Sequence, residues 1–257
     1  MADPDSPLAG RRVVVARPVG SGRALARRIA ALGGEPLVLP GATLRPAAGT
    51  SPAQLAAALA ADVVVFTSPA SVRFARALCP RLRVAARTAV LAPGHGTARA
   101  LARAGVAAQV PGRADSEGLL SLPALRGARG RRVALVGAPG GRGLLDAALA
   151  QRGARVSRIH VYERALPRWR AVHRERAARI DSRTLVLLSS AEALDALRAL
   201  MGDDAWRRAL RATAVASSAR LAALARRRGF ARVVRARSAL AADLVDAGVA
   251  AARRVSR

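Results

Sequence analysis

Short runs of β-branched and aliphatic residues alternate along the chain with alanine-rich segments of helical periodicity. In one such segment Leu25, Ile29 and Leu32 fall on a single face, and a Gly-Gly pair follows as a stop. Another predicted helix opens with Ser51-Pro52, a capping residue followed by proline in the first turn. This alternation predicts an α/β protein with parallel sheets. The strand-like runs are Arg12–Ala16, Pro36–Leu39, Asp62–Phe66, Thr88–Ala92, Val106–Val110, Arg132–Val136, Val156–Tyr162, Thr184–Leu188, Thr213–Ala216 and Ala231–Val234.

The chain also repeats itself over about half its length. Residues 13–15 (VVV) correspond to residues 133–135 (VAL), an offset of 133 − 13 = 120, and residues 64–68 (VVFTS) correspond to residues 186–190 (VLLSS), an offset of 186 − 64 = 122. Solenoid repeats are much shorter, about 20–50 residues. The repeat therefore predicts two similar α/β domains of flavodoxin-like or Rossmann-like type, with the default binding site in a cleft between them.

The charge balance is extreme. The net charge is +28, and every fixed positive side chain is arginine because the chain contains no lysine. One interpretation is a polyanion-binding protein, and the other is a solvated arginine surface that reflects coding bias. Nucleic-acid binding is disfavoured, because aromatic residues make up only 2% of the chain and no recognition motif is present.

Several classes are excluded by composition. The longest uncharged stretch, Pro46 to Ala61, contains two prolines and is too short to span a bilayer. The first seven residues lack a secretory signal pattern, and the single cysteine, Cys79, excludes a disulfide scaffold. The three histidines have no metal-ligand spacing. We expect a cytoplasmic monomer that needs no membrane.

Arginine, glycine and hydroxyl-bearing residues follow most of the predicted strands. In parallel sheets ligands bind beyond the carboxyl ends of the strands, where helix N-termini expose N–H groups that bind anions. The plainer interpretation is that such residues only cap helices. The candidate binding residues are Arg17, Thr67, Ser68, Gly96, Thr97, Ser116, Gly118, Gly141, Arg142, Ser189, Ser190, Ser217 and Ser218.

Conventional catalytic motifs are missing from the sequence. The glycine-rich segment 137–143 lacks both the P-loop lysine and the dinucleotide-binding spacing, and there is no Gly-x-Ser-x-Gly elbow. His95 follows a strand without a paired acid, and His160 is expected to pack within a strand. Tyr162, the only tyrosine, ends the strand Val156–Tyr162, where it is either an interface aromatic with a solvated hydroxyl or a functional group.

Taken together, these motifs resemble the uroporphyrinogen-III synthase family, enzymes that close a linear tetrapyrrole with inversion of its last ring. The similarity extends from about Gly10 to Gly248. It is carried by six segments in order: 13–18 (VVVARP), 65–68 (VFTS) with Val72, 94–101 (GHGTARAL), 116–120 (SEGLL), 140–145 (GGRGLL) and 161–164 (VYER).

The resemblance implies a particular domain organisation. Residues 8–39 and 167–255 would form one discontinuous α/β domain, and residues 49–158 the other. Residues 40–48 and 159–166 would be linkers in a two-stranded connection, with residues 1–7 as a flexible N-terminus. The substrate would be hydroxymethylbilane, a linear tetrapyrrole with eight carboxylates, and no metal or organic cofactor would be required.

By the same resemblance, the reaction loses the hydroxymethyl oxygen as water to give an azafulvene. The last ring then attacks through its substituted carbon, and the resulting spiro intermediate fragments and recloses in inverted form. Tyr162 would assist departure of water, directly or through a water that it holds. Thr97 and Ser218, or the neighbouring Ser217, would bind substrate carboxylates.

Two other classes remain open from the residues. A two-domain α/β module that binds an acidic small molecule without catalysis would use the same cleft. A charge-driven nucleic-acid binder would lose affinity steeply with salt.

Overall fold

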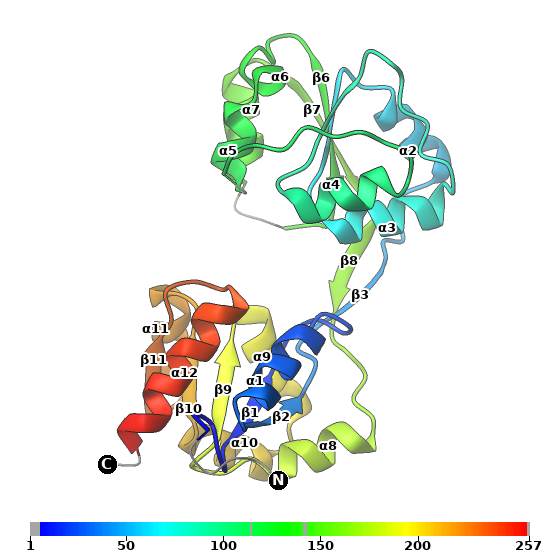
Figure 1. The fold of residues 1–257 in the computed structure, drawn as a ribbon. Coiled ribbons are helices and arrows are strands. Elements are labelled where there is room, and N and C mark those ends of the chain that lie inside the picture. The colour runs from blue at the N-terminus through cyan, green and yellow to red at the C-terminus, as the bar shows by residue number, and fades with distance from the viewer. Residues whose placement is uncertain (1–5, 114, 141–142, 256–257) are drawn as a thin grey trace. The chain divides into compact units, whose positions relative to one another are not determined.

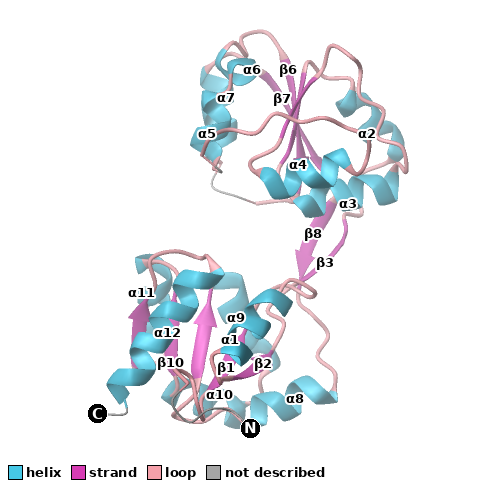
Figure 2. Cartoon of the chain, viewed as in Figure 1, coloured by secondary structure: helices cyan, strands magenta, loops and turns pink. Residues whose placement is uncertain are grey.

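The computed structural model describes residues 6–113, 115–140 and 143–255. Its contacts divide the chain into two units, Met1–Leu44 with Ala165–Arg257, and Arg45–Arg164. The first unit is discontinuous, so the blue N-terminal elements share it with the yellow-to-red C-terminal ones (Figure 1). Each unit has its own parallel sheet with helices packed against it (Figure 2).

The first unit contains a five-stranded parallel sheet in the order β11-β10-β9-β1-β2. This order corresponds to the flavodoxin-like arrangement, because the N-terminal strand lies inside the sheet beside a strand from the second half of the chain. The strands are β1 (Arg12–Val15), β2 (Glu35–Val38), β9 (Leu185–Leu188), β10 (Thr213–Ala216) and β11 (Arg232–Arg235), and the helices are α1 (Arg23–Ala31), α8 (Ala171–Ala178), α9 (Ala191–Leu200), α10 (Asp203–Arg211), α11 (Ala219–Arg227) and α12 (Ala241–Val255).

Alternate residues of these strands build two cores on the two faces of the sheet. Val13 and Val15 pack with Leu25 and Ile29 of α1 and with α12. Val14 packs on the opposite face, in a core that includes side chains of α9, α10 and α11. Successive side chains of a strand point to opposite faces, so strands with both faces covered are apolar throughout.

The second unit contains a four-stranded parallel sheet in the order β5-β4-β6-β7. Its core is built largely by Val63 and Val65 of β4 and Leu135 of β6, together with leucines from α5, α6 and α7. The strands are β4 (Val63–Phe66), β5 (Ala89–Leu91), β6 (Arg132–Gly137) and β7 (Arg155–His160), and the helices are α2 (Pro52–Leu59), α3 (Pro69–Leu78), α4 (His95–Ala102), α5 (Ser116–Ser121), α6 (Pro123–Arg126) and α7 (Leu144–Gln151).

Two further strands, β3 (Thr43–Pro46) and β8 (Tyr162–Ala165), pair in a two-stranded sheet. The boundaries between the two units fall within these strands, at Leu44/Arg45 and Arg164/Ala165. In the part of the chain that is described, the helices are all too short or too polar to cross a bilayer.

The α/β class and the parallel sheets predicted from the sequence are confirmed. The helix starts predicted from local signals are also confirmed, since Ser51 is the N-cap of α2 with proline at N1. Two strand predictions were wrong. Residues 106–110 form only an isolated bridge, Leu91 to Gln109, because Pro111 follows and lacks a donor for a longer ladder. The run Val156–Tyr162 is broken at Val161, so Tyr162 begins β8 instead of ending β7.

Candidate functional site

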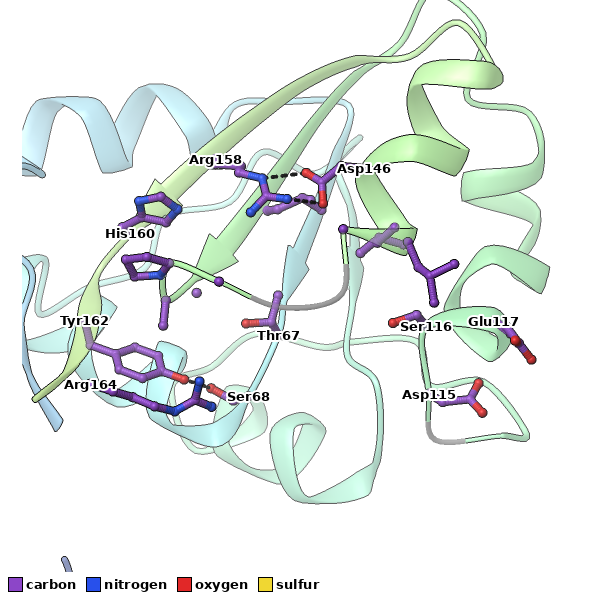
Figure 3. Close-up of a pocket in the computed structure, with 18 of the residues that line it drawn as sticks. Thr67, Ser68, Asp115, Ser116, Glu117, Asp146, Arg158, His160, Tyr162 and Arg164 are labelled. Atoms are coloured by element: carbon purple, nitrogen blue, oxygen red, sulfur yellow. Dashed lines mark hydrogen bonds and ion pairs between the residues drawn. The ribbon is translucent and has the colours of Figure 1, made fainter. Parts of the chain in front are cut away.

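A cavity of about 480 Å³ lies in the second unit, beyond the carboxyl ends of β4, β6 and β7 (Figure 3). This edge of the sheet is where parallel α/β proteins bind ligands. The lining is mainly polar, with hydroxyls, carboxylates, arginines and a histidine among the side chains. It comprises Thr67, Ser68, Arg113, Asp115, Ser116, Glu117, Leu135, Gly137, Ala138, Pro139, Gly140, Gly143, Leu144, Leu145, Asp146, Arg158, His160, Tyr162 and Arg164.

Tyr162 is held in the cavity wall by two contacts. Its hydroxyl lies 3.1 Å from the Ser68 hydroxyl, and either group can donate the hydrogen bond. Its ring stacks on Phe74 of α3, with centroids 5.3 Å apart and an interplanar angle of 17°. The side chain is buried, which favours a functional group over the alternative of an interface aromatic. A buried phenol with one fixed hydroxyl partner is a positioned proton donor or acceptor.

Ser68 is oriented by the start of helix α3. Its hydroxyl accepts a hydrogen bond from the Ser71 backbone N–H at 3.1 Å, while the Ser71 hydroxyl donates to the Ser68 carbonyl at 2.6 Å. Pro69 occupies the first turn, where its missing N–H has no intrahelical partner to lose. A hydroxyl oxygen has two lone pairs and one proton, so Ser68 can cap the helix and still contact Tyr162.

A row of alternate residues crosses the cavity wall from β7 into β8. Arg158, His160, Tyr162 and Arg164 are spaced by two residues, and all four line the cavity. In an extended chain such residues point to the same side. Of the four, only Tyr162 was predicted as a functional residue, although this two-residue spacing of polar side chains was readable in the sequence.

Arg158 is fixed by Asp146 of α7. The guanidinium Nε donates to Oδ1 of Asp146 at 2.6 Å, and the Nη2 group pairs with Oδ2, which makes the contact bidentate (Figure 3). The forked geometry matches a carboxylate and restricts rotation of the guanidinium. One cationic side chain of the wall is therefore held by a carboxylate of the same wall.

His160 contributes an imidazole whose Nε2 is buried and has no hydrogen-bond partner among the described residues. Its backbone carbonyl accepts a hydrogen bond from the Thr50 hydroxyl at 2.9 Å. The prediction that His160 belongs to a strand is confirmed, since it is the last residue of β7, and its ring lines the cavity.

The opposite part of the wall is formed by the start of α5. Asp115 caps this helix by accepting a hydrogen bond from the Gly118 N–H at 2.7 Å. Arg113 pairs with both Asp115 and Glu117. A Cβ at position 118 would overlap the Arg113 carbonyl oxygen, so a glycine is required there for close backbone approach. Glu117 is thus engaged in an ion pair at the helix start, where an acid is favoured.

Among the described residues of the predicted binding set, the cavity brings together Thr67, Ser68 and Ser116, and it places them beside Tyr162, the predicted catalytic residue. Gly96 and Thr97 belong to α4 and do not line it, and the Thr97 side chain is buried. Gly118 supports α5 without lining the cavity. Gly141 and Arg142 lie outside the described residues.

The remaining predicted residues belong to the first unit. Ser190 and Ser218 are N-caps of α9 and α11, accepting from the N–H groups of Ala193 and Leu221. Ser189 and Ser217 precede them, and the Ser217 hydroxyl donates to the Ser189 carbonyl at 3.4 Å. Arg17 follows β1 and lines a separate cavity of that unit.

The lining chemistry suits proton donation and anion binding. Among the described lining residues, no serine or threonine hydroxyl has a hydrogen bond to a histidine, so a nucleophile–base pair is not formed. Across residues 6–113, 115–140 and 143–255, no three His, Cys, Asp or Glu side chains gather to hold a metal ion.

Comparison with known proteins gives one consistent family. A model of the family described as uroporphyrinogen-III synthase HemD matches residues 23–246. A uroporphyrinogen-III synthase of Salmonella typhimurium is 34% identical over 234 residues, which cover 85% of this chain and 92% of that protein.

Solved structures are similar at the level of the fold. The uroporphyrinogen-III synthetase of Helicobacter pylori superposes with a TM-score of 0.61 at 13% identity, covering 94% of this chain and 99% of that one. A mutant uroporphyrinogen III synthase of the extremely thermophilic bacterium Thermus thermophilus gives a TM-score of 0.57 at 22% identity, covering 96% and 100%.

Proposed function

The chain belongs to the uroporphyrinogen-III synthase family, and on that premise we propose that the Tyr162 cavity takes part in closing hydroxymethylbilane to uroporphyrinogen III. The chain is an enzyme of tetrapyrrole biosynthesis. The observation that carries the assignment of the site is the buried Tyr162 hydroxyl, 3.1 Å from Ser68 in a polar cavity.

The first chemical step needs a proton at the hydroxymethyl oxygen. Tyr162 donates it, directly or through a water that it holds, and the C–O bond breaks to release water and leave an N-protonated azafulvene, whose extra proton is the one lost at ring closure. Ser68 stabilises the phenol in the orientation for donation. Phenols are weak acids and pyrroles are electron-rich, so Tyr162 assists a departure that the substrate itself largely drives.

Ring closure needs positioning more than acid–base chemistry. The last ring attacks the azafulvene carbon through its substituted carbon, the spiro intermediate fragments, and the released end recloses in inverted form with loss of a proton. Holding the two ends of the tetrapyrrole in reacting geometry supplies much of the rate acceleration, as for other bound reactants.

Binding of the substrate carboxylates is assigned to small polar residues and backbone N–H groups at helix starts. Hydroxyl and backbone N–H groups of this kind bind anions, and Arg17 and Arg142 add cationic donors. The proposed set is Arg17, Thr67, Ser68, Gly96, Thr97, Ser116, Gly118, Gly141, Arg142, Ser189, Ser190, Ser217 and Ser218. Contacts of this kind are distributed, so single substitutions in the set lower activity without abolishing it.

We also propose that the protein works as a cytoplasmic monomer without nucleic acid, metal or organic cofactor. Residues 8–39 with 167–255 and residues 49–158 are proposed as its two folding domains, with residues 40–48 and 159–166 as linkers.

A coupled assay tests the function. Purified protein is mixed with freshly generated hydroxymethylbilane, the products are oxidised, and the porphyrin isomers are separated. The proposal expects type III as the dominant isomer. If only type I forms, which is the product of spontaneous closure, catalysis is contradicted and a non-catalytic module that binds acidic small molecules takes its place.

A further inference from the structure

A second cavity, of about 740 Å³, lies entirely within the first unit, beside the loop that follows β1. Four arginines line it: Arg17, Arg23, Arg27 and Arg170. Its other lining residues are glycine, proline, alanine and valine, and no carboxylate is among them. The volume is in the range that small-molecule sites usually have, about 300–1,000 Å³.

The four guanidinium groups come from three different elements. Arg17 lies two residues beyond the end of β1, and Arg170 is the N-cap of α8. Arg23 and Arg27 are separated by four residues on α1, so they lie on one face of the helix, one turn apart. The fold, and not a single basic run in the sequence, collects these cations around one space.

The structure provides these cations with no compensating acid. In the described part of the chain, none of the four arginines forms an ion pair, although other arginines of the same unit do. Arg28, the neighbour of Arg27, is paired with Asp246 at 3.3 Å. Arg17 donates to a neutral acceptor, the Ala239 carbonyl, at 2.6 Å. Burial lowers the pKa of the Arg17 guanidinium, as expected for a desolvated cation without a counter-charge.

The N-terminus of α1 lies at the same cavity. Its N-cap is Gly22, which has no side chain to cap the helix, and the first turn contains no acidic residue. Gly20 and Gly22 both line the cavity, and Gly20 has a φ of +82°, a left-handed conformation that glycine adopts readily. The positive end of the helix, where backbone N–H groups have no intrahelical partner, therefore borders the cavity that the arginines line.

We propose that this cavity is a carboxylate site, in which Arg17, Arg23, Arg27 and Arg170 bind side-chain carboxylates of a polyanionic tetrapyrrole. The assignment rests on the proposed function, because that function supplies an octacarboxylate as the ligand. Guanidinium forks match carboxylates in a bidentate geometry, and several such groups on one ligand satisfy several arginines together. The lining contains no aromatic side chain on which a nucleobase could stack, which disfavours single-stranded nucleic acid.

The test uses the full chain and a fluorescent octacarboxylate, uroporphyrin III. Binding is titrated for the wild type, for the double variant Arg23→Gln/Arg27→Gln, and for Arg28→Gln as the matched control on the same helix. Arg23 and Arg27 are exposed, so the double variant is expected to fold normally, which circular dichroism checks. Loss of two charge-assisted contacts predicts binding weakened by about tenfold or more for the double variant, and a change below about twofold for Arg28→Gln.

The same proteins are then assayed with hydroxymethylbilane. The proposal expects a raised KM for the double variant, with kcat and the type III fraction unchanged. Equal binding by wild type and double variant, or an equal loss in Arg28→Gln, overturns the assignment. Competition separates the anion classes: butanetetracarboxylate is expected to displace the porphyrin at lower concentration than inorganic pyrophosphate, and the reverse order overturns the carboxylate site. Failure of the proposed function gives a different result from failure of the carboxylate site, because the wild type would then yield only the type I isomer.

Discussion

The Tyr162 hydroxyl and the Ser68 hydroxyl, 94 positions apart in the chain, meet at 3.1 Å in the wall of one cavity. Ser68 starts α3 and Tyr162 starts β8, so the contact links the end of β4 to the chain segment that follows β7. Phe74, further along α3, stacks on the tyrosine ring. A single helix thus fixes both the ring and the hydroxyl of Tyr162.

Tyr162→Phe keeps the ring and removes the hydroxyl. We expect formation of uroporphyrinogen III to slow about tenfold, less than a principal acid would lose, because Tyr162 only assists departure of water. The free energy of unfolding should fall by about 1 kcal/mol, the value of one hydrogen bond. Steady-state kinetics and isomer separation check the first expectation, and urea denaturation the second. An unchanged rate of uroporphyrinogen III formation would show that the Tyr162 hydroxyl takes no part in catalysis.

Ser68→Ala separates positioning of Tyr162 from helix capping. It is compared with Ser51→Ala, which removes the equivalent capping hydroxyl from α2 of the same unit, outside the cavity. Each substitution should lower stability by about 1 kcal/mol. Only Ser68→Ala should also lower the rate of type III formation. An equal fall in rate for both variants would show that Ser68 acts through stability alone.

Asp146→Asn removes one negative charge from the cavity wall and releases the Arg158 guanidinium. Because the substrate is anionic, we expect its KM to fall about threefold, an effect of the size that partly exposed ion pairs show. Asp195→Asn is the matched control, since it breaks the ion pair with Arg228 away from the cavity. Initial rates over a range of substrate concentrations measure the effect. A raised KM would instead mean that substrate binding needs Arg158 held in place.

Gly118→Ala should destabilise the second unit. The new Cβ would overlap the Arg113 carbonyl oxygen, and backbone cannot give way as a flexible side chain can. We expect a loss of about 1–3 kcal/mol, seen as a lower Tm. Gly49→Ala is the control, because a Cβ there meets nothing within 4 Å. If both variants melt like the wild type, the close approach at Gly118 does not exist.

The start of α8 should respond to pH through His173. Its Nδ1 accepts a hydrogen bond from the Arg170 backbone N–H at 2.9 Å. Burial, and then the guanidinium groups of Arg170 and Arg176, lower the pKa of His173. His173 therefore binds a proton more readily in the unfolded chain than in the folded one. Stability from this group is fully present above the unfolded pKa of about 6.5, and it is lost as the pH falls from there through the folded pKa.

His173→Gln keeps an acceptor at this position and removes the titration. We expect its free energy of unfolding to vary less with pH than that of the wild type over about pH 5–7, whereas His173→Ala should be about 1 kcal/mol less stable than His173→Gln at every pH. Urea denaturation at several pH values measures this. Parallel curves for wild type and His173→Gln would contradict the assignment.

Local signals predicted most of the sheet strands, because buried parallel strands are apolar throughout and their neighbouring helices carry caps. No local signal predicted the strand β3, since its residues 43–46 have no apolar run and gain their pairing from β8, more than a hundred positions away. Only the family resemblance implied a two-stranded connection of residues 40–48 with residues 159–166. The segment 106–110 failed for the opposite reason, because its composition favours a strand while only Gln109 finds a partner.

The site was predictable only in part. Thr67, Ser68 and Ser116 were found because hydroxyls after strands mark ligand-binding edges. The two-residue spacing of Arg158, His160, Tyr162 and Arg164 could have indicated Arg158, but its ion pair with Asp146 follows from the packing of α7 against the edge strand β7. No sequence pattern within either segment predicts this ion pair.

The place of β1 inside its sheet determines the order in which the chain can fold during synthesis. β1 pairs with β2 on one side and with β9 on the other, Val13 lying opposite Leu185. The continuous unit Arg45–Arg164 has all of its partners once its own residues have left the ribosome. The β1–α1–β2 segment is synthesised before the second unit, but one edge of β1 stays unpaired until β9 emerges from the ribosome. A chain that stalls or ends before β9 would therefore expose that apolar edge, so this early-made segment stays open to aggregation until most of the chain has been synthesised.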